Sequence, residues 1–164
     1  MARWLEVLAR AGLALALVGA AGAVRAQDEK PTAKQVAAIR ACAEKNQDDV
    51  TAAEQQCLFN LVAEPCQKTP VGQSNVGMAD CFRLEAKIWD DLLNDNYKSL
   101  REELDTSQAG KLRDMQRAWI SYRDATCGFY DVKIQGTMAI PMSAACLARE
   151  SMRRAVLLKF FSRM

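Results

Sequence analysis

Cysteines and adjacent carboxylates are the residues of this sequence that could do chemistry. Histidine is absent from all 164 residues, which removes the commonest general base, the commonest zinc ligand and every Ser–His or Cys–His pair. Asp90–Asp91 and Glu102–Glu103 are adjacent carboxylates, and a glycosidase uses two carboxyl groups that flank one sugar bond. Neighbours on a helix point about 100° apart, so neither pair converges on a substrate. We predict that the protein is not an enzyme, with an envelope glycosidase as the weaker alternative.

Six cysteines predict a disulfide framework. They are separated by 15, 9, 15, 46 and 19 residues, and none forms the C-x-x-C pair typical of zinc, redox or haem sites. In an exported chain an even number of cysteines favours three disulfides over a metal, and we predict neither a metal nor another cofactor. Six thiols allow fifteen pairings, of which we choose the pairing of sequence neighbours because short loops close most easily. The expected disulfides are Cys42–Cys57, Cys66–Cys81 and Cys127–Cys146.

The start of the chain indicates export. Arg3 and Arg10 precede a run of apolar residues and glycine over 11–23. Val24 and Ala26 then place small residues at the −3 and −1 positions that a signal peptidase recognises. A membrane-spanning helix needs about 20 apolar residues, so a spanning segment is the weaker alternative. We predict a signal peptide over residues 1–26 and a periplasmic or secreted protein.

Removal of this segment would leave a chain without net charge. Cleavage after Ala26 leaves 19 basic and 19 acidic residues. The mature chain therefore lacks the excess of positive charge that binds the phosphates of nucleic acids. Half of all residues are hydrophobic and 26% are charged, which suits one globular domain. We expect a monomer that binds no nucleic acid and does not span the membrane.

Two capping patterns predict short helices near the start of the mature chain. T-x-x-Q from Thr32 and T-x-x-E from Thr51 match the capping box, in which two side chains bond the free amides of a helix start. We therefore expect helices over 33–45 and 52–63, with Pro65 just beyond the second. A hairpin of these helices would bring the first two cysteines together.

The turn-forming residues of 69–77 predict a loop between a Cys-rich helical region, 27–77, and a helical domain, 78–164. The domain begins with apolar residues at helical spacing, which predict a long amphipathic helix. We assign the polar residues between them, including Glu85, to solvent. The apolar stripe consists of Cys81, Leu84, Ile88, Trp89, Leu92, Leu93, Tyr97, Leu100 and Leu104.

A second helix is predicted from the apolar period that resumes at Leu112, and we expect it to end at Cys127–Gly128 because glycine is a common helix stop. Residues 129–142 are expected to form a connecting loop. Ser143 is the expected N-cap of a last helix that reaches residue 161. The predicted fold is all-α: a small disulfide-linked bundle with a long helical hairpin and a C-terminal helix.

Three segments carry a resemblance to a known family. They are WDDLLNDNYKSL from Trp89 to Leu100, QRAWISYRDATC from Gln116 to Cys127, and CLARESMRRAVLL from Cys146 to Leu158. In this order and spacing they resemble the LprI-like lysozyme-inhibitor N-terminal domain, which occurs in bacterial envelope proteins. The resemblance covers residues 81–158 and departs from the family at position 151, where serine replaces the more frequent threonine. It implies a small helical envelope protein with a lysozyme-inhibiting activity.

Eight residues of these segments are candidate structural positions. The four aromatic ones could stack on sugars, but their helical spacing favours core packing. Asn94, Arg123 and Asp124 could hold a ligand, but a hydrogen-bond network between helices is favoured, because a buried polar group without a partner costs about 1–3 kcal/mol. The eight are Trp89, Asn94, Tyr97, Gln116, Trp119, Tyr122, Arg123 and Asp124.

The apolar segment between Cys127 and Cys146 is the candidate surface for a partner. Phe129, Tyr130 and Ile140 lie in it, and it has few charges. Such side chains either pack on their own core, which is favoured, or dock on a partner. A disulfide between its ends would lower the entropy cost of presenting it.

These patterns together predict an exported envelope protein whose role is binding. The resemblance makes inhibition of a peptidoglycan-cleaving lysozyme the leading hypothesis, with a lysozyme or peptidoglycan as the partner. The alternative is a structural or peptidoglycan-associated envelope protein without inhibitory activity.

Overall fold

The computed structural model describes residues 30–164, and the predicted signal peptide lies outside them. This part of the chain contains six α-helices, one short 3-10 helix and no strand, which confirms the all-α prediction. No helix within it is both long and apolar enough to span a membrane. The elements are α1 (Ala33–Lys45), α2 (Val50–Cys57), α3 (Ala63–Gln67), η2 (Pro70–Gln73), α4 (Asn75–Glu103), α5 (Thr106–Lys133) and α6 (Ala139–Phe161).

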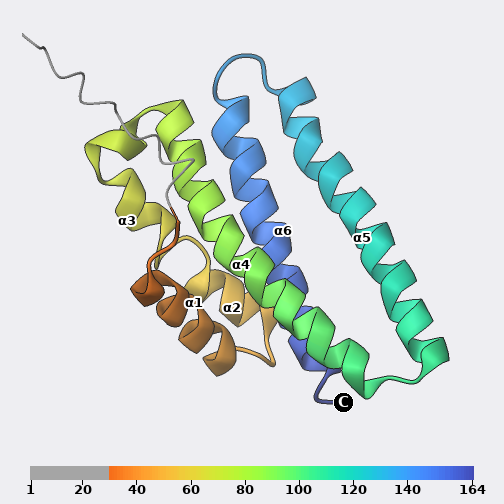
Figure 1. Cartoon of the computed structure of the whole chain (residues 1–164). Coiled ribbons are helices and arrows are strands. Elements are labelled where there is room, and N and C mark those ends of the chain that lie inside the picture. Colours follow the sequence, from red (N-terminus) through yellow and green to blue (C-terminus); the bar gives the residue numbers. More distant parts are fainter. Residues whose placement is uncertain (1–29) are drawn as a thin grey trace, which may run out of the picture.

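Three long helices form the bundle, and α6 lies between the other two (Figure 1). It packs against α4 along most of its length and against α5 on another side. The short helices cover the remaining faces: α2 packs on α6, and α1 and α3 pack on α4. The expected hairpin of long helices is therefore present as α4 and α5, with the last helix packed into it.

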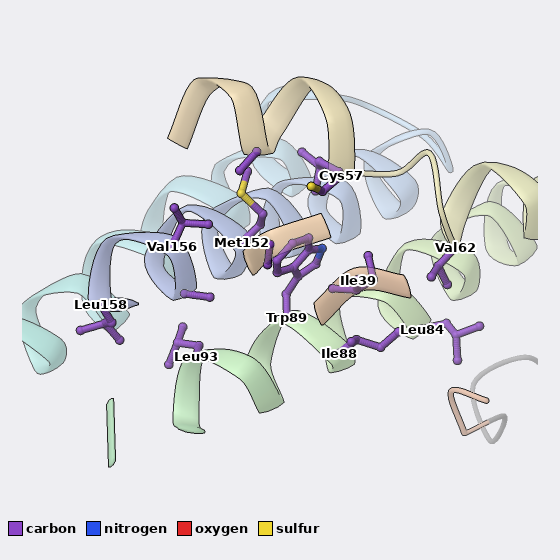
Figure 2. Packing of buried hydrophobic residues seen from close by; sticks show 14 of the residues in the cluster. Ile39, Cys57, Val62, Leu84, Ile88, Trp89, Leu93, Met152, Val156 and Leu158 are labelled. Carbon is purple, nitrogen blue, oxygen red and sulfur yellow. The ribbon is translucent and has the colours of Figure 1, made fainter. Parts of the chain in front are cut away.

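The core is centred on Trp89, which is fully buried. Figure 2 shows its ring extending from α4 toward Ile39 of α1 and Met152 of α6. Ile88 and Leu93 of α4 belong to the same cluster of buried side chains. The Cys-rich region and the long helices thus share one hydrophobic core.

Glu85 is buried beside this core, so its assignment to solvent was wrong. Its carboxylate accepts hydrogen bonds from the backbone amides of Phe59 at 2.7 Å and Ala63 at 2.9 Å, and from Trp89 Nε1 at 3.1 Å. Phe59 has a φ of 68°, in the left-handed region, where the chain turns from α2 to α3. Glu85 therefore supplies the acceptor that this turn lacks. Burial raises its pKa, although the three hydrogen bonds act in the opposite direction.

The first predicted helix is confirmed, whereas the second differs at both ends. The capping box at Thr32 is present. The carboxylate of Asp49, and not Thr51, caps α2 by accepting the amides of Thr51 and Ala52. The helix ends at Cys57 because the chain turns there toward Glu85, and Pro65 lies in the first turn of α3, where proline removes no helical hydrogen bond. The predicted loop over 69–77 contains η2, and α4 already begins at Asn75.

The predicted long loop over 129–142 is wrong. Helix α5 continues through Gly128 to Lys133, and α6 begins at Ala139, so only residues 134–138 connect them. A glycine inside a helix costs only about 1 kcal/mol relative to alanine, which is too little to end α5 while the buried Cys127 holds it against α6. Ser143 lies inside α6 and is not its N-cap.

The three disulfides are Cys42–Cys57, Cys66–Cys81 and Cys127–Cys146, the expected pairing. The first joins α1 to α2, the second joins α3 to α4, and the third joins the last turns of α5 to α6. Each therefore fixes one pair of neighbouring elements.

Replacing Glu85 by alanine should destabilise the fold strongly. The variant leaves the amides of Phe59 and Ala63 and the indole of Trp89 without their acceptor, and each buried unpaired donor costs about 1–3 kcal/mol. We expect Glu85→Ala to lower the free energy of unfolding by at least about 3 kcal/mol in urea titrations. The control is Glu64→Ala, at an exposed position, which should change it by less than about 0.5 kcal/mol. Equal stability of the two variants would contradict this role.

The stability that Glu85 contributes should depend on pH. Because burial raises the pKa of this carboxyl above its ordinary value of 4.5, the folded state binds the proton more readily than the unfolded state does. The free energy of unfolding of the wild type relative to Glu85→Gln should therefore increase as the pH falls from neutral toward 4.5. Thermal unfolding of both proteins across this range measures it, and a constant difference would refute the prediction.

Candidate functional site

Two segments without charged residues meet at one end of the bundle. Residues 69–79 and 134–148 contain no Asp, Glu, Lys or Arg, although 26% of the chain is charged. The first comprises η2 and the start of α4, and the second comprises the α5–α6 turn and the start of α6 (Figure 1). Asn75 Nδ2 donates to Thr137 Oγ1 at 2.9 Å and links the segments. We name these two segments the uncharged end.

Exposed apolar side chains gather at this end and beside it. Of ten large hydrophobic side chains that are exposed in residues 30–164, six belong to the uncharged end or to the adjoining last turns of α5. Phe129 is 59% exposed and Val132 is 78% exposed. Charged residues are depleted from the cores of protein interfaces, and clustered apolar surface marks binding sites. The six residues are Val71, Val76, Phe129, Val132, Met138 and Met142.

The backbone of the uncharged end is held in place by close packing and disulfides. A Cβ atom on Gly77 would lie 1.7 Å from the carbonyl oxygen of Val71, and one on Gly72 would lie 2.5 Å from the Cα of Gln67. Gly77 is therefore needed for η2 to lie directly on α4, and Gly72 for η2 to lie against the end of α3. The disulfides Cys66–Cys81 and Cys127–Cys146 join the elements on either side. A surface fixed in this way loses little conformational entropy on binding.

The three residues predicted to contact a partner lie at the uncharged end or beside it, on helices and not on a loop. Phe129 is exposed near the end of α5. Tyr130, also on α5, and Ile140, in the first turn of α6, are half-buried. Tyr130 and Ile140 therefore pack partly on the core, whereas Phe129 does not. Their role in binding stays a prediction.

A second cluster joins α5 to α6 around Trp119. The guanidinium carbon of Arg123 lies 5.0 Å from the ring centroid, and that of Arg154 on α6 lies 5.5 Å from it. Arg154 is 5% exposed, and its Nε donates to Gln116 Oε1 at 2.7 Å. Burial lowers the pKa of Arg154, and a cation over an indole face is favourable in such a setting. This cluster ties the two helices together in the middle of the bundle.

Comparison with known proteins gave one match. The family model of the lysozyme inhibitor LprI matches residues 66–158. The chain belongs to this family. Neither curated proteins nor solved structures gave a match.

The LprI match confirms the resemblance found in the sequence and extends further toward the N-terminus. It begins at Cys66, not Cys81, so the family region contains the disulfide between them. Both segments of the uncharged end lie within the matched residues. The uncharged end therefore lies within the family region.

The polar LprI motif residues form fewer links between helices than expected. Asn94 Nδ2 donates to Asp90 at 3.2 Å, and Arg123 Nε donates to Asp124 at 2.9 Å, each on its own helix. The expected network is therefore wrong for Asn94, Arg123 and Asp124, although Gln116 does bond Arg154 across helices. Sequence reasoning missed Asn96, whose amide donates to the carbonyl of Ala155 on α6 at 2.8 Å.

The aromatic motif residues divide into two groups. Trp89 is buried, and Tyr97 and Trp119 are partly buried against the core, which agrees with the packing prediction. Tyr122 is 55% exposed, so that prediction was wrong for it. Tyr122 precedes Arg123 on α5, and it is Arg123 that lies with Trp119 near α6. Tyr122 is one position before Arg123 on the helix, and its phenol ring therefore points toward solvent and not toward α6.

A small pocket of about 170 Å³ lies between α1, α4 and α6. Its charges are balanced, since Arg40 bonds Asp95 at 2.5 Å and Lys159 lies 3.9 Å from Glu44. Within residues 30–164 no group of three His, Cys, Asp or Glu side chains is placed to hold a metal. The uncharged end thus remains the best candidate for a functional site.

Trp119 and Tyr122 should respond differently to truncation. Trp119→Ala removes the contact with Arg154 and part of the α5–α6 interface, and we expect a loss of about 2 kcal/mol in the free energy of unfolding, less than for a fully buried tryptophan. Tyr122→Ala is the matched control on the same helix, and its loss should stay below about 0.5 kcal/mol. Urea titrations of both variants test this. A larger loss for Tyr122→Ala would contradict the assignment of the two faces.

Proposed function

We propose that the protein is an exported binding protein of the bacterial envelope that inhibits a lysozyme, and that the uncharged end docks on the enzyme. The observation that carries this proposal is the gathering of six exposed apolar side chains at and beside the uncharged end, four of them within its two charge-free segments. Membership of the LprI family supplies the class of partner. The proposal includes the prediction that the chain is not itself an enzyme.

The shape and chemistry of this end suit the cleft of a glycosidase. A lysozyme cleft is concave and contains two carboxyl groups, one of them in an apolar pocket. The α5–α6 turn presents Met138, and Val132 is exposed just before this turn, in the last turn of α5. Exposed Gln135 in the same turn offers an amide donor for a carboxylate. An uncharged surface enters such a cleft without burying a charge of its own.

The disulfides support both the location and the affinity. Three disulfides persist in an oxidising compartment, which agrees with the predicted periplasmic or secreted location. Two of them flank the uncharged end, so the apolar side chains are already ordered before binding. A chain without net charge lacks long-range steering, and we therefore expect its inhibition to depend only weakly on salt.

The test adds charge to the proposed surface. Purified protein is added to cell-wall lysis by several lysozyme types, and the wild type should protect the walls in a dose-dependent manner. The double variant Val132→Glu and Met138→Glu should inhibit at least about tenfold less well, because it buries unpaired carboxylates in the interface. Tyr122→Glu is the matched control: it adds a charge at an exposed aromatic position of the same α5 and should inhibit like the wild type.

Each outcome bears on a separate part of the proposal. Full inhibition by the double variant would show that another surface binds the enzyme. No protection at high excess against any lysozyme type would refute inhibition and favour a structural envelope role. Release of fragments from peptidoglycan by the protein alone would refute the prediction that it is not an enzyme.

A further inference from the structure

A second hollow lies at the end of the bundle opposite the uncharged end. The last turns of α4 and the first turns of α5 border an open cleft of about 540 Å³ beside the turn that joins them. Pockets that bind small molecules commonly have about 300–1,000 Å³. The cleft is therefore large enough for one or two sugar rings.

The cleft is positively charged. Arg101 of α4 and Arg113 of α5 line it, and none of the described residues that line it is acidic. Among residues 30–164, no salt bridge involves Arg101. Arg113 lies 3.6 Å from Asp114, and both side chains are mostly exposed. Two arginines thus line the same cleft without a strong internal partner, in contrast to the balanced pocket at Arg40.

Apart from Thr106, the remaining walls are apolar or aromatic. Leu104, Ala109 and Gly110 line the cleft, and so does the half-buried Tyr97. Such walls suit the apolar face of a sugar ring, since a tyrosine provides a flat apolar face together with a hydroxyl that can form hydrogen bonds.

Gly110 keeps one wall of the cleft open. It lies inside α5, where glycine costs about 1 kcal/mol relative to alanine. A Cβ atom built on it would meet no other atom within 4 Å. Packing therefore does not require a glycine at this position, whereas a larger side chain would project into free space beside the guanidinium groups.

From this geometry we propose that the cleft binds a carboxylated saccharide. The carboxylate accepts hydrogen bonds from the guanidinium groups of Arg101 and Arg113, because hydrogen bonds between two charged groups are among the strongest in proteins. The sugar ring lies on Tyr97 and the apolar wall. This site does not depend on lysozyme inhibition. Because it lies at the opposite end of the bundle, a wall glycan and a protein partner can bind at the same time.

The binding test compares acidic and neutral sugars on the full mature protein. The probes are N-acetylmuramic acid, glucuronic acid, neutral N-acetylglucosamine and acetate, followed by the backbone amide resonances of α4 and α5. Both sugar acids should shift the resonance of Gly110 saturably, and the neutral sugar and acetate should bind at least about tenfold more weakly. Tighter binding of N-acetylmuramic acid would identify wall glycan strands whose lactyl carboxylate carries no peptide as the source, and tighter binding of glucuronic acid would identify a uronic acid polymer.

Variants test the cleft residues directly. Arg101→Gln and Arg113→Gln should each weaken binding of the sugar acid about tenfold, whereas Arg117→Gln, an exposed arginine of α5 outside the cleft, should not. Gly110→Leu should abolish binding without loss of thermal stability. Gly128→Leu is its matched control, because Gly128 also lies inside α5 with open space around it and outside the cleft.

Three results would overturn the proposal. They are the absence of saturable binding of either sugar acid to the wild type, equal binding of acidic and neutral sugars, and unchanged binding by Arg101→Gln. Lysis assays of the same variants separate this site from the proposed function, since Arg101→Gln should still inhibit lysozyme and the Val132 and Met138 double variant should still bind the sugar acid. Either property can therefore fail without the other.

Discussion

The burial of α6 between α4 and α5 is the constraint on which the rest of the structure depends. This helix carries buried side chains around much of its circumference, and a helix of that kind needs neighbours on several sides. Two charged side chains of α6, Glu150 and Arg154, are also buried. Arg154 is accommodated by Gln116 and Trp119 of α5, and Glu150 bonds Arg153, which in turn bonds Glu54 of α2. These requirements set where α5 and the Cys-rich region lie along α6.

The disulfides act locally within this arrangement. Each joins cysteines that are 15 or 19 residues apart, so each closes one short loop and is worth about 3 kcal/mol in the chain-entropy model. Two of them stiffen the end where η2, α4, α5 and α6 meet, whereas the α4–α5 turn at the other end has only the capping box of Asp105 and Gln108. The rigid end is the one that presents apolar surface.

The two ends of the bundle differ in chemistry because charge is distributed unevenly along the chain. Residues 69–79 and 134–148 are free of charge, and the fold places both at one end. Arginines from α4 and α5 line one cleft at the other end. Under the two proposals above, the apolar end would bind the partner protein and the cationic cleft would bind a wall saccharide.

The sequence by itself determined the helical class, the disulfide pairing, the N-terminus of α1 and the family. These follow from local physics: apolar spacing, loop closure and capping involve residues close together in the chain. The two uncharged segments are also visible in the sequence. The sequence does not show that they meet, because Asn75 and Thr137, which link them, are 62 residues apart. Only the tertiary structure decided that Glu85 is buried, that Tyr122 is exposed and that α5 continues past Gly128. In each case contacts with another helix or turn, which no local pattern encodes, outweighed the preference of the segment alone.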